Sequence, residues 1–158
     1  MTIRFERTYD LALVKSIITH PALYEFLSDD FFSPAEDFRP NDAPQIVRLL
    51  AYDGDELLGL FSASPINAIL WQVDHALLPS SWGRRAREAA KAFFAWLWEN
   101  TPAVKAVGFT PGANALALRF ARSLGMRECG RIAGAYQKRF ALQDLVIFEK
   151  DRPSWQRL

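Results

Sequence analysis

The sequence predicts a mixed α/β fold, in which helices cover both faces of a central β-sheet. The predicted elements run in the order strand, two helices, three strands, helix, strand, helix and two strands, which favours such a layered arrangement. Half of the 158 residues are apolar, which is enough to fill one core, but the chain is too short for two ordinary domains. We therefore expect a single domain over residues 1–158, with residues 151–158 as a polar tail.

The first part of the chain predicts an edge strand and two helices. Ile3 and Phe5 alternate with charged residues, as in a short edge strand. Asp10 is suited to cap a helix whose apolar residues recur at helical spacing: Leu11, Val14, Ile17 and Ile18. Pro21 is suited to the first turn of a second short helix, which extends through Leu27.

A loop over residues 28–44 combines acidic with aromatic side chains: Asp29, Asp30, Glu36, Asp37, Phe31, Phe32 and Phe38. This composition is suited to a pocket for a cationic or amine-bearing ligand. For any one of these residues, a surface loop whose phenylalanines fill the core is the simpler interpretation. The sequence leaves both interpretations open.

Three strands are expected next. Residues 46–52 and 56–64 are apolar runs on either side of Asp53-Gly54-Asp55, a hairpin signal. Residues 68–78 form a third, longer strand. Strand alternation places His75 and Leu77 on one face of it and Asp74 on the other.

The turn at residues 79–83 and the helix after it predict an anion site. From Arg84 onward, apolar residues recur at helical spacing, and the first amides of such a helix have no partner within the helix. Gly83 lets a ligand approach the backbone closely. Three arginines, Arg84, Arg85 and Arg87, lie where the helix dipole disfavours positive charge, and a bound polyanion would offset that cost.

The last elements are a strand over residues 105–110, a helix and two strands. Asn114 is suited to cap the helix, which ends near Ser123, and Gly125 is a natural left-handed stop. Residues 126–136 and 142–150 form the closing strands.

Charge and composition exclude several classes of protein. A net charge of +1 argues against broad nucleic-acid binding, so we expect a small partner and neither nucleic acid nor membrane. Cys129 is the only cysteine, no secretory signal begins the sequence, and no apolar run approaches the roughly 20 residues that span a bilayer. We expect a cytoplasmic protein.

Two segments resemble the GNAT superfamily of acyl-CoA-dependent N-acyltransferases. LPSSWGRRAREAAKAF is similar to the diphosphate-binding turn and helix of that family. The run from Asn114 through Gly125 to Gly130 is similar to a second family pattern, which consists of an asparagine, an amphipathic helix, Gly-Phe and Glu-Gly. Tyr136 and Asp144 stand where the branch that acetylates protein N-termini and ribosomal proteins often has an aromatic residue and an aspartate. The whole pattern is also similar to small GNAT-like proteins of phage and prophage genomes.

Four positions depart from the family pattern. Ser80 replaces a leading Arg or Gln, and Arg85 replaces a small residue after Gly83. Ala121 aligns with a tyrosine that protonates the departing thiolate in many members. Phe140 replaces a glycine of the last hairpin.

The resemblance implies a GNAT-like sheet, acetyl-CoA as the donor substrate and no metal. It places the coenzyme on the end of the third long strand, the turn and the helix start: Leu77, Ser81, Trp82, Gly83, Arg84, Arg85, Ala86 and Arg87. Asn114 is a further candidate, for a contact with the pantetheine of the coenzyme, and Arg119 is a candidate for a contact with its 3'-phosphate. A plain N-cap and a solvated arginine are the alternatives for these two.

The implied reaction moves an acyl group to an amine, which must lose a proton. His75 is the first candidate for the base because an unperturbed histidine has a pKa near 6.5. Asp74 is a candidate either to orient His75 or to act as the base in its place. Tyr136 or solvent supplies the proton for the thiolate. The alternative for His75 is a buried strand histidine whose ring is bonded to a backbone carbonyl.

These observations favour an N-acetyltransferase that acts on a primary amine of a small molecule or a protein. A catalytically inactive acyl-CoA-binding or protein-interaction module on the same fold is the alternative. A third hypothesis is a small nucleic-acid-binding protein, which the near-neutral net charge disfavours. The oligomeric state is open, a homodimer included.

Overall fold

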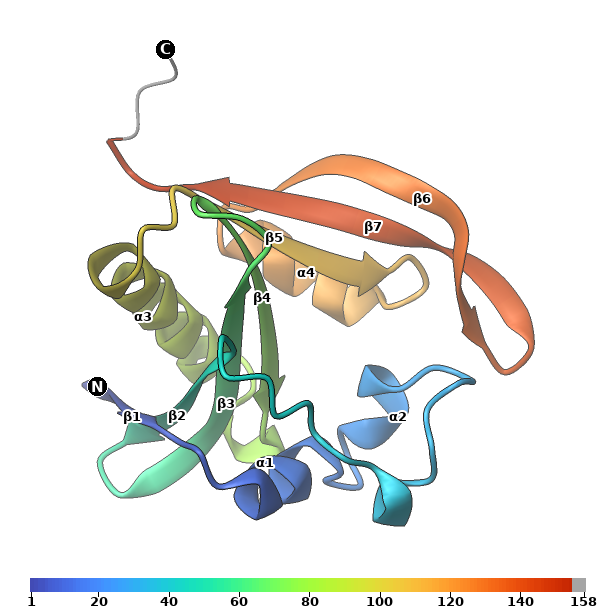
Figure 1. Ribbon diagram of the computed structural model, residues 1–158, viewed down its shortest axis with the longest axis horizontal. Helices are drawn as coiled ribbons and strands as arrows, with labels where there is room; N and C mark the ends of the chain where they lie inside the picture. The colour runs from blue at the N-terminus through green and yellow to red at the C-terminus, as the bar shows by residue number, and fades with distance from the viewer. Residues whose placement is uncertain (155–158) are drawn as a thin grey trace.

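The computed structural model describes residues 1–154 and contains one seven-stranded sheet with helices on both faces (Figure 1). The strand order in the sheet is β1-β2-β3-β4-β5-β7-β6. Neighbouring strands are antiparallel except β4 and β5, which are parallel. The mixed α/β fold and the predicted order of elements are confirmed.

The strands have these bounds: β1 Ile3–Arg7, β2 Val47–Asp53, β3 Glu56–Pro65, β4 Leu70–Leu77, β5 Lys105–Pro111, β6 Arg127–Lys138 and β7 Ala141–Asp151. The α-helices are α1 Leu11–Ile18, α2 Tyr24–Leu27, α3 Arg84–Asn100 and α4 Ala115–Ser123. Two short 3-10 helices, η1 Ala35–Asp37 and η2 Pro79–Ser81, lie in the loops.

Two predicted caps form and one helix is shorter than expected. Asp10 Oδ1 accepts the amide of Leu13 at 3.1 Å at the start of α1, and Asn114 caps α4. The helix predicted from Pro21 begins only at Tyr24, because residues 21–23 form a turn. In that turn His20 Nδ1 accepts the amide of Ala22 at 3.1 Å.

The sheet separates two apolar clusters. The larger cluster joins α3 to one face and includes Leu49, Phe61, Phe93 and Leu97. The smaller joins α1 to the other face through Val14, Leu50, Leu60 and Ala76. Because successive strand residues point to opposite faces, Leu49 and Leu50 belong to different clusters.

The sheet opens between β4 and β5 (Figure 1). The two strands pair only at residues 70–72 of β4 with residues 105–107 of β5. β4 then continues to Leu77 beside β3, and β5 continues to Pro111 beside β7. Among the described strands, none therefore neighbours one edge of the second half of β4.

The hairpin between β6 and β7 keeps a tight turn without glycine. Arg139 and Phe140 have φ values of 51° and 62°, in the left-handed region. Each of their amides donates to the carboxylate of Asp30 at 2.8 Å, which stabilises the turn from outside.

Strand β7 extends through Asp151, so the polar tail begins at residue 152, one residue later than predicted. Its last part, residues 155–158, lies outside the described residues. In the part of the chain that the structure describes, no helix is both long enough and apolar enough to cross a membrane.

Candidate active site

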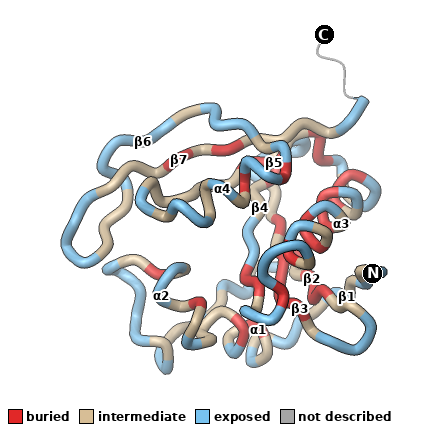
Figure 2. The backbone as a smooth tube through the Cα atoms, turned by 180° about the vertical axis from the view of Figure 1, so that it is seen from behind, coloured by how far each residue is buried: buried red, intermediate tan, exposed pale blue. Residues whose placement is uncertain are grey.

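A cleft of about 920 Å³ occupies the opening between β4 and β5. Figure 2 shows, from behind, the elements that surround it: α2, α3, α4, β4 and β5. We group its lining residues by the elements that carry them. The α3 half comprises residues of the turn before α3, of α3 and of the start of α4: Trp82, Gly83, Ala86, Arg87, Ala90, Asn114, Ala117 and Arg119. The α2 half comprises residues beside or on α2, β4 and β6: Leu23, Phe26, Leu27, Asp29, Asp74 and Tyr136.

The start of α3 presents free backbone amides at the α3 half. Gly83 is the N-cap residue with φ 90° and ψ −129°, and no side chain caps the helix. The first intrahelical bond runs from the amide of Arg87 to the carbonyl of Gly83 at 3.2 Å, so the amides before it have no partner in the helix. A Cβ built on Gly83 would meet no heavy atom within 4 Å. The backbone there is open to a ligand.

The three arginines of this helix start have different surroundings. Arg84 and Arg87 are exposed, and Arg87 lines the cleft. Arg85 instead turns to the β2–β3 hairpin, where its Nη2 lies 2.6 Å from Glu56 and 3.3 Å from Asp53. These carboxylates raise the pKa of Arg85. We therefore assign Arg85 a structural ion pair in place of the expected phosphate contact.

The turn before α3 is held together internally. Ser81 is fully buried, and its hydroxyl and amide donate to the carbonyl of Leu78 at 2.7 and 2.9 Å. Ser81 is thus a poor candidate for a ligand contact. Trp82 is about half exposed, lines the cleft and donates from Nε1 to the carbonyl of Leu77 at 2.8 Å. Buried Leu77 and Ala86 complete this wall.

The α4 residues face the same half of the cleft from the other side. Asn114 Oδ1 accepts the amide of Ala117 at 3.1 Å, so its N-cap role is confirmed, and the residue also lines the cleft. Arg119 is exposed and lines the cleft one turn further along. Both stay available to a ligand in the α3 half.

His75 lies on the second half of β4, where it pairs with Phe61 of β3 on one edge and faces the opening on the other. Its ring is 6.2 Å from the ring of Phe61 and 5.1 Å from that of Phe120, and within residues 1–154 it makes no hydrogen bond. Water reaches the imidazole through the cleft, but protein atoms surround it on most sides, and this desolvation lowers the pKa of His75 to about 4. The ring is therefore neutral at pH 7. The alternative of a ring bonded to a backbone carbonyl is not observed.

Asp74 points to the opposite side of β4, in the α2 half. Its carboxylate accepts a weak bond from Gln72 Nε2 at 3.3 Å, and no basic side chain among residues 1–154 pairs with it. Surrounding protein atoms withdraw water from the carboxylate, and this desolvation raises the pKa of Asp74. A positively charged ligand would relieve this cost.

Tyr136 reaches the α2 half from β6. Its hydroxyl donates to the carbonyl of Ser28 at 2.9 Å, and desolvation followed by the negative charge of Asp29 raises the pKa of Tyr136. It therefore stays protonated at neutral pH. Ala121, on α4, is buried and offers no hydroxyl group.

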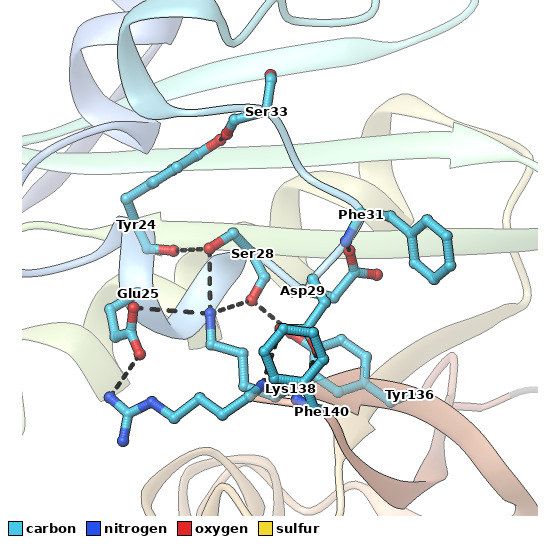
Figure 3. A network of polar contacts seen from close by, with 11 residues as sticks. Tyr24, Glu25, Ser28, Asp29, Phe31, Ser33, Tyr136, Lys138 and Phe140 are labelled. Atoms are coloured by element: carbon cyan, nitrogen blue, oxygen red, sulfur yellow. Dashed lines mark hydrogen bonds and ion pairs between the residues drawn. The ribbon is translucent and has the colours of Figure 1, made fainter.

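Sequence reasoning missed a set of contacts that joins α2 to the β6–β7 hairpin (Figure 3). We call it the clasp, formed by Glu25, Ser28, Asp30, Tyr136, Lys138 and Arg139. Lys138 Nζ donates to the carbonyl of Ser28 at 2.6 Å, and Glu25 pairs with both Lys138 and Arg139 at 3.7 and 2.8 Å. No local pattern could have revealed the clasp, because its partners are more than 100 residues apart in the chain.

Comparison with known proteins identifies the fold as that of the GNAT acetyltransferases. Over 95% of this chain and 94% of the other, the structure is similar to a spermidine N-acetyltransferase from Vibrio cholerae in complex with CoA and spermine, with a TM-score of 0.75 and 14% identity. A protein from Desulfovibrio desulfuricans that is assigned to the GNAT family is similar over 95% and 99% of the two chains, with a TM-score of 0.68 and 15% identity.

No protein-family model and no curated protein matches the sequence itself. The likeness thus lies in the backbone arrangement. It does not extend to the particular activity of this chain.

Proposed function

We propose that this protein is an N-acetyltransferase that moves an acetyl group from acetyl-CoA to a primary amine. One observation carries the proposal: the gap between β4 and β5 leads directly to the uncapped start of α3. A gap of this kind can hold an extended chain, and free amides at a helix start can hold its phosphates.

The donor fits the α3 half of the cleft. Its diphosphate would accept hydrogen bonds from the first amides of α3, with Arg84 and Arg87 as counter-charges. Its pantetheine would lie along the free edge of β4. The amide of Leu78 donates to β3, so alternation of the antiparallel ladder turns the backbone groups of His75 and Leu77 toward the gap. Asn114 and Arg119 would contact the coenzyme from α4.

The chemistry is a direct transfer. The amine nitrogen attacks the thioester carbonyl, a C–N bond forms, the C–S bond breaks, and the amine proton passes to a base. His75 is suited to this step because its imidazole is neutral and has no partner among residues 1–154. A backbone amide of β4 would stabilise the developing oxyanion. Tyr136, or water, would return a proton to the thiolate.

A thiol-release assay tests the proposal. Acetyl-CoA is mixed with the protein and a panel of primary amines and peptides, and free thiol is followed with time. We expect release above the uncatalysed rate with at least one amine, together with an acetylated product that is heavier by one acetyl group. Absence of release across a broad panel contradicts the proposal.

A catalytically inactive acyl-CoA-binding module is the second candidate. Two observations favour it: Ala121 offers no acid on α4, and the hydroxyl of Tyr136 is already bonded to Ser28. Calorimetric titration with CoA separates the candidates. Binding without turnover, unchanged in His75→Ala, supports the inactive module, and the absence of any heat contradicts both.

A further inference from the structure

Opposite charges occupy the two halves of the cleft. The basic residues that line it, Arg87 and Arg119, lie in the α3 half. The carboxylates that line it, Asp29 and Asp74, lie in the α2 half, where no basic residue among residues 1–154 is part of the lining. If the α3 half binds the coenzyme as proposed, the α2 half is left for the acceptor and favours a cation.

One face of α2 makes the same half apolar. Leu23, Phe26 and Leu27 have the spacing of one helix face, and all three line the cleft. Leu23 is buried in the core, whereas Phe26 is 56% exposed. A large exposed ring on a cleft wall gains free energy when an apolar group covers it. An acceptor that reaches Asp29 and Asp74 would therefore contact apolar surface at the same time.

Three other acidic residues of this region, Asp30, Glu25 and Asp37, lie outside the cleft lining. Asp30 accepts two amides of the β6–β7 turn, and Glu25 pairs with Lys138 and Arg139 in the clasp (Figure 3). Asp37 lines a separate, shallow cavity of about 350 Å³ on the surface. Even Asp29 uses one oxygen to accept the amide of Phe31 at 2.8 Å. A chain with three or four ammonium groups would find too few carboxylates in the cleft.

We infer that the acceptor is a primary amine with a single positive charge, joined by a short linker to an apolar group. Asp29 and Asp74 attract the ammonium group, and Phe26 and its neighbours on α2 cover the apolar group. This inference rests on the proposed function and narrows its substrate class. It also separates this chain from its structural neighbour, whose structure holds the tetra-amine spermine.

Competing acceptors test the inference. Thiol release is measured with 2-phenylethylamine, ethylamine and spermidine, and with the peptides Phe-Ala-Ala-Ala and Ser-Ala-Ala-Ala. We expect kcat/KM for 2-phenylethylamine to exceed that for ethylamine and spermidine by about tenfold or more, the effect of burying one aromatic ring. For the same reason, kcat/KM should be higher for Phe-Ala-Ala-Ala than for Ser-Ala-Ala-Ala, and the reverse order contradicts the inference.

A matched pair of variants links the preference to the cleft. Phe26→Ala should remove most of the advantage of 2-phenylethylamine over ethylamine. Phe31→Ala, which truncates a neighbouring ring that is 87% exposed and lies outside the cleft lining, should preserve it. Equal loss in both variants, or a higher kcat/KM for spermidine, overturns the inference and leaves the proposed transferase intact.

Binding is measured in parallel, so that the inference does not depend on turnover. Protein saturated with CoA is titrated with 2-phenylethylamine by calorimetry, and then with spermidine. Tighter binding of 2-phenylethylamine that Phe26→Ala weakens supports the acceptor class even if no thiol is released, a result that would contradict only the transferase. If 2-phenylethylamine binds no more tightly than spermidine, the inference is overturned.

Discussion

The two halves of the cleft are built in different ways. The α3 half comes mainly from one continuous stretch, in which the end of β4, a turn and the start of α3 follow each other. Its binding groups are largely backbone amides. The α2 half is assembled from α2, β4 and β6, and the clasp holds it together across more than 100 residues of chain. Its binding groups are side chains.

Under the proposed function, the backbone groups of the α3 half would bind the coenzyme, and the side chains of the α2 half would determine which acceptor fits. Backbone amides survive substitution of the side chains around them, so the uncapped helix start at Gly83 is present although Ser80 and Arg85 depart from the GNAT pattern that the sequence resembles. Side chains set charge and shape, so single substitutions in the α2 half change the acceptor that fits. The variants below test this contrast, beginning with the largest expected effect.

His75→Gln tests the proposed catalytic base in the cleft. Loss of the base should lower kcat/KM by about 100-fold or more. His20→Gln is the control, since His20 lies outside the cleft at the end of α1. Equal activity of both variants and the wild type would exclude His75 as the base.

The pH dependence of the wild type provides a second test of His75. Because the pKa of His75 is about 4, activity should fall only as the pH approaches that value, without a step near 6.5. The unfolded chain binds this proton more readily, so stability should decrease as the pH falls from about 6.5 to 4. Urea unfolding at several pH values should show a smaller decrease in His75→Gln.

Gly83→Ala tests the backbone site of the α3 half. At φ 90° an L-residue costs about 1 to 3 kcal/mol, and relaxation of the turn would misplace the first amides of α3. The Kd for CoA should rise about tenfold or more in calorimetry. Gly54→Ala imposes similar strain at φ 59° in the β2–β3 turn, and its Kd for CoA should not change.

Two arginines of the same helix turn should separate binding from stability. Arg87→Ala should raise the Kd for CoA about fivefold, by loss of about 1 kcal/mol, with little change in unfolding. Arg85→Ala removes the ion pairs with Glu56 and Asp53, and unfolding should become only slightly easier because Glu56 is half exposed. A large effect of Arg85→Ala on CoA affinity would contradict its structural assignment.

The smallest effect is expected from the clasp. Lys138→Met removes a charged donor from the carbonyl of Ser28 and should lower the unfolding free energy by about 1 kcal/mol. Hydrogen exchange of the amides in residues 28–32 should quicken, while CoA affinity stays unchanged. Lys91→Met is the control because Lys91 is exposed and, among residues 1–154, pairs only with Glu88. Equal exchange in both variants would show that Lys138 does not hold α2.

Local patterns predicted most of the fold. Hydrophobic spacing, the capping residues Asp10 and Asn114 and the hairpin signal at Gly54 act over a few residues, so they can be read directly from the chain. The error at α2 is also local, because the turn that His20 stabilises competes with the first turn of the predicted helix.

The sequence by itself determined the order of elements, the sheet type and the free helix start at Gly83, because each depends on neighbours in the chain. Only the tertiary structure decided that Arg85 turns to the β2–β3 hairpin, that Ser81 is buried, and that Asp30 supports the β6–β7 turn. The direction of a long or polar side chain depends on partners brought near by folding, and those partners lie far away in the sequence.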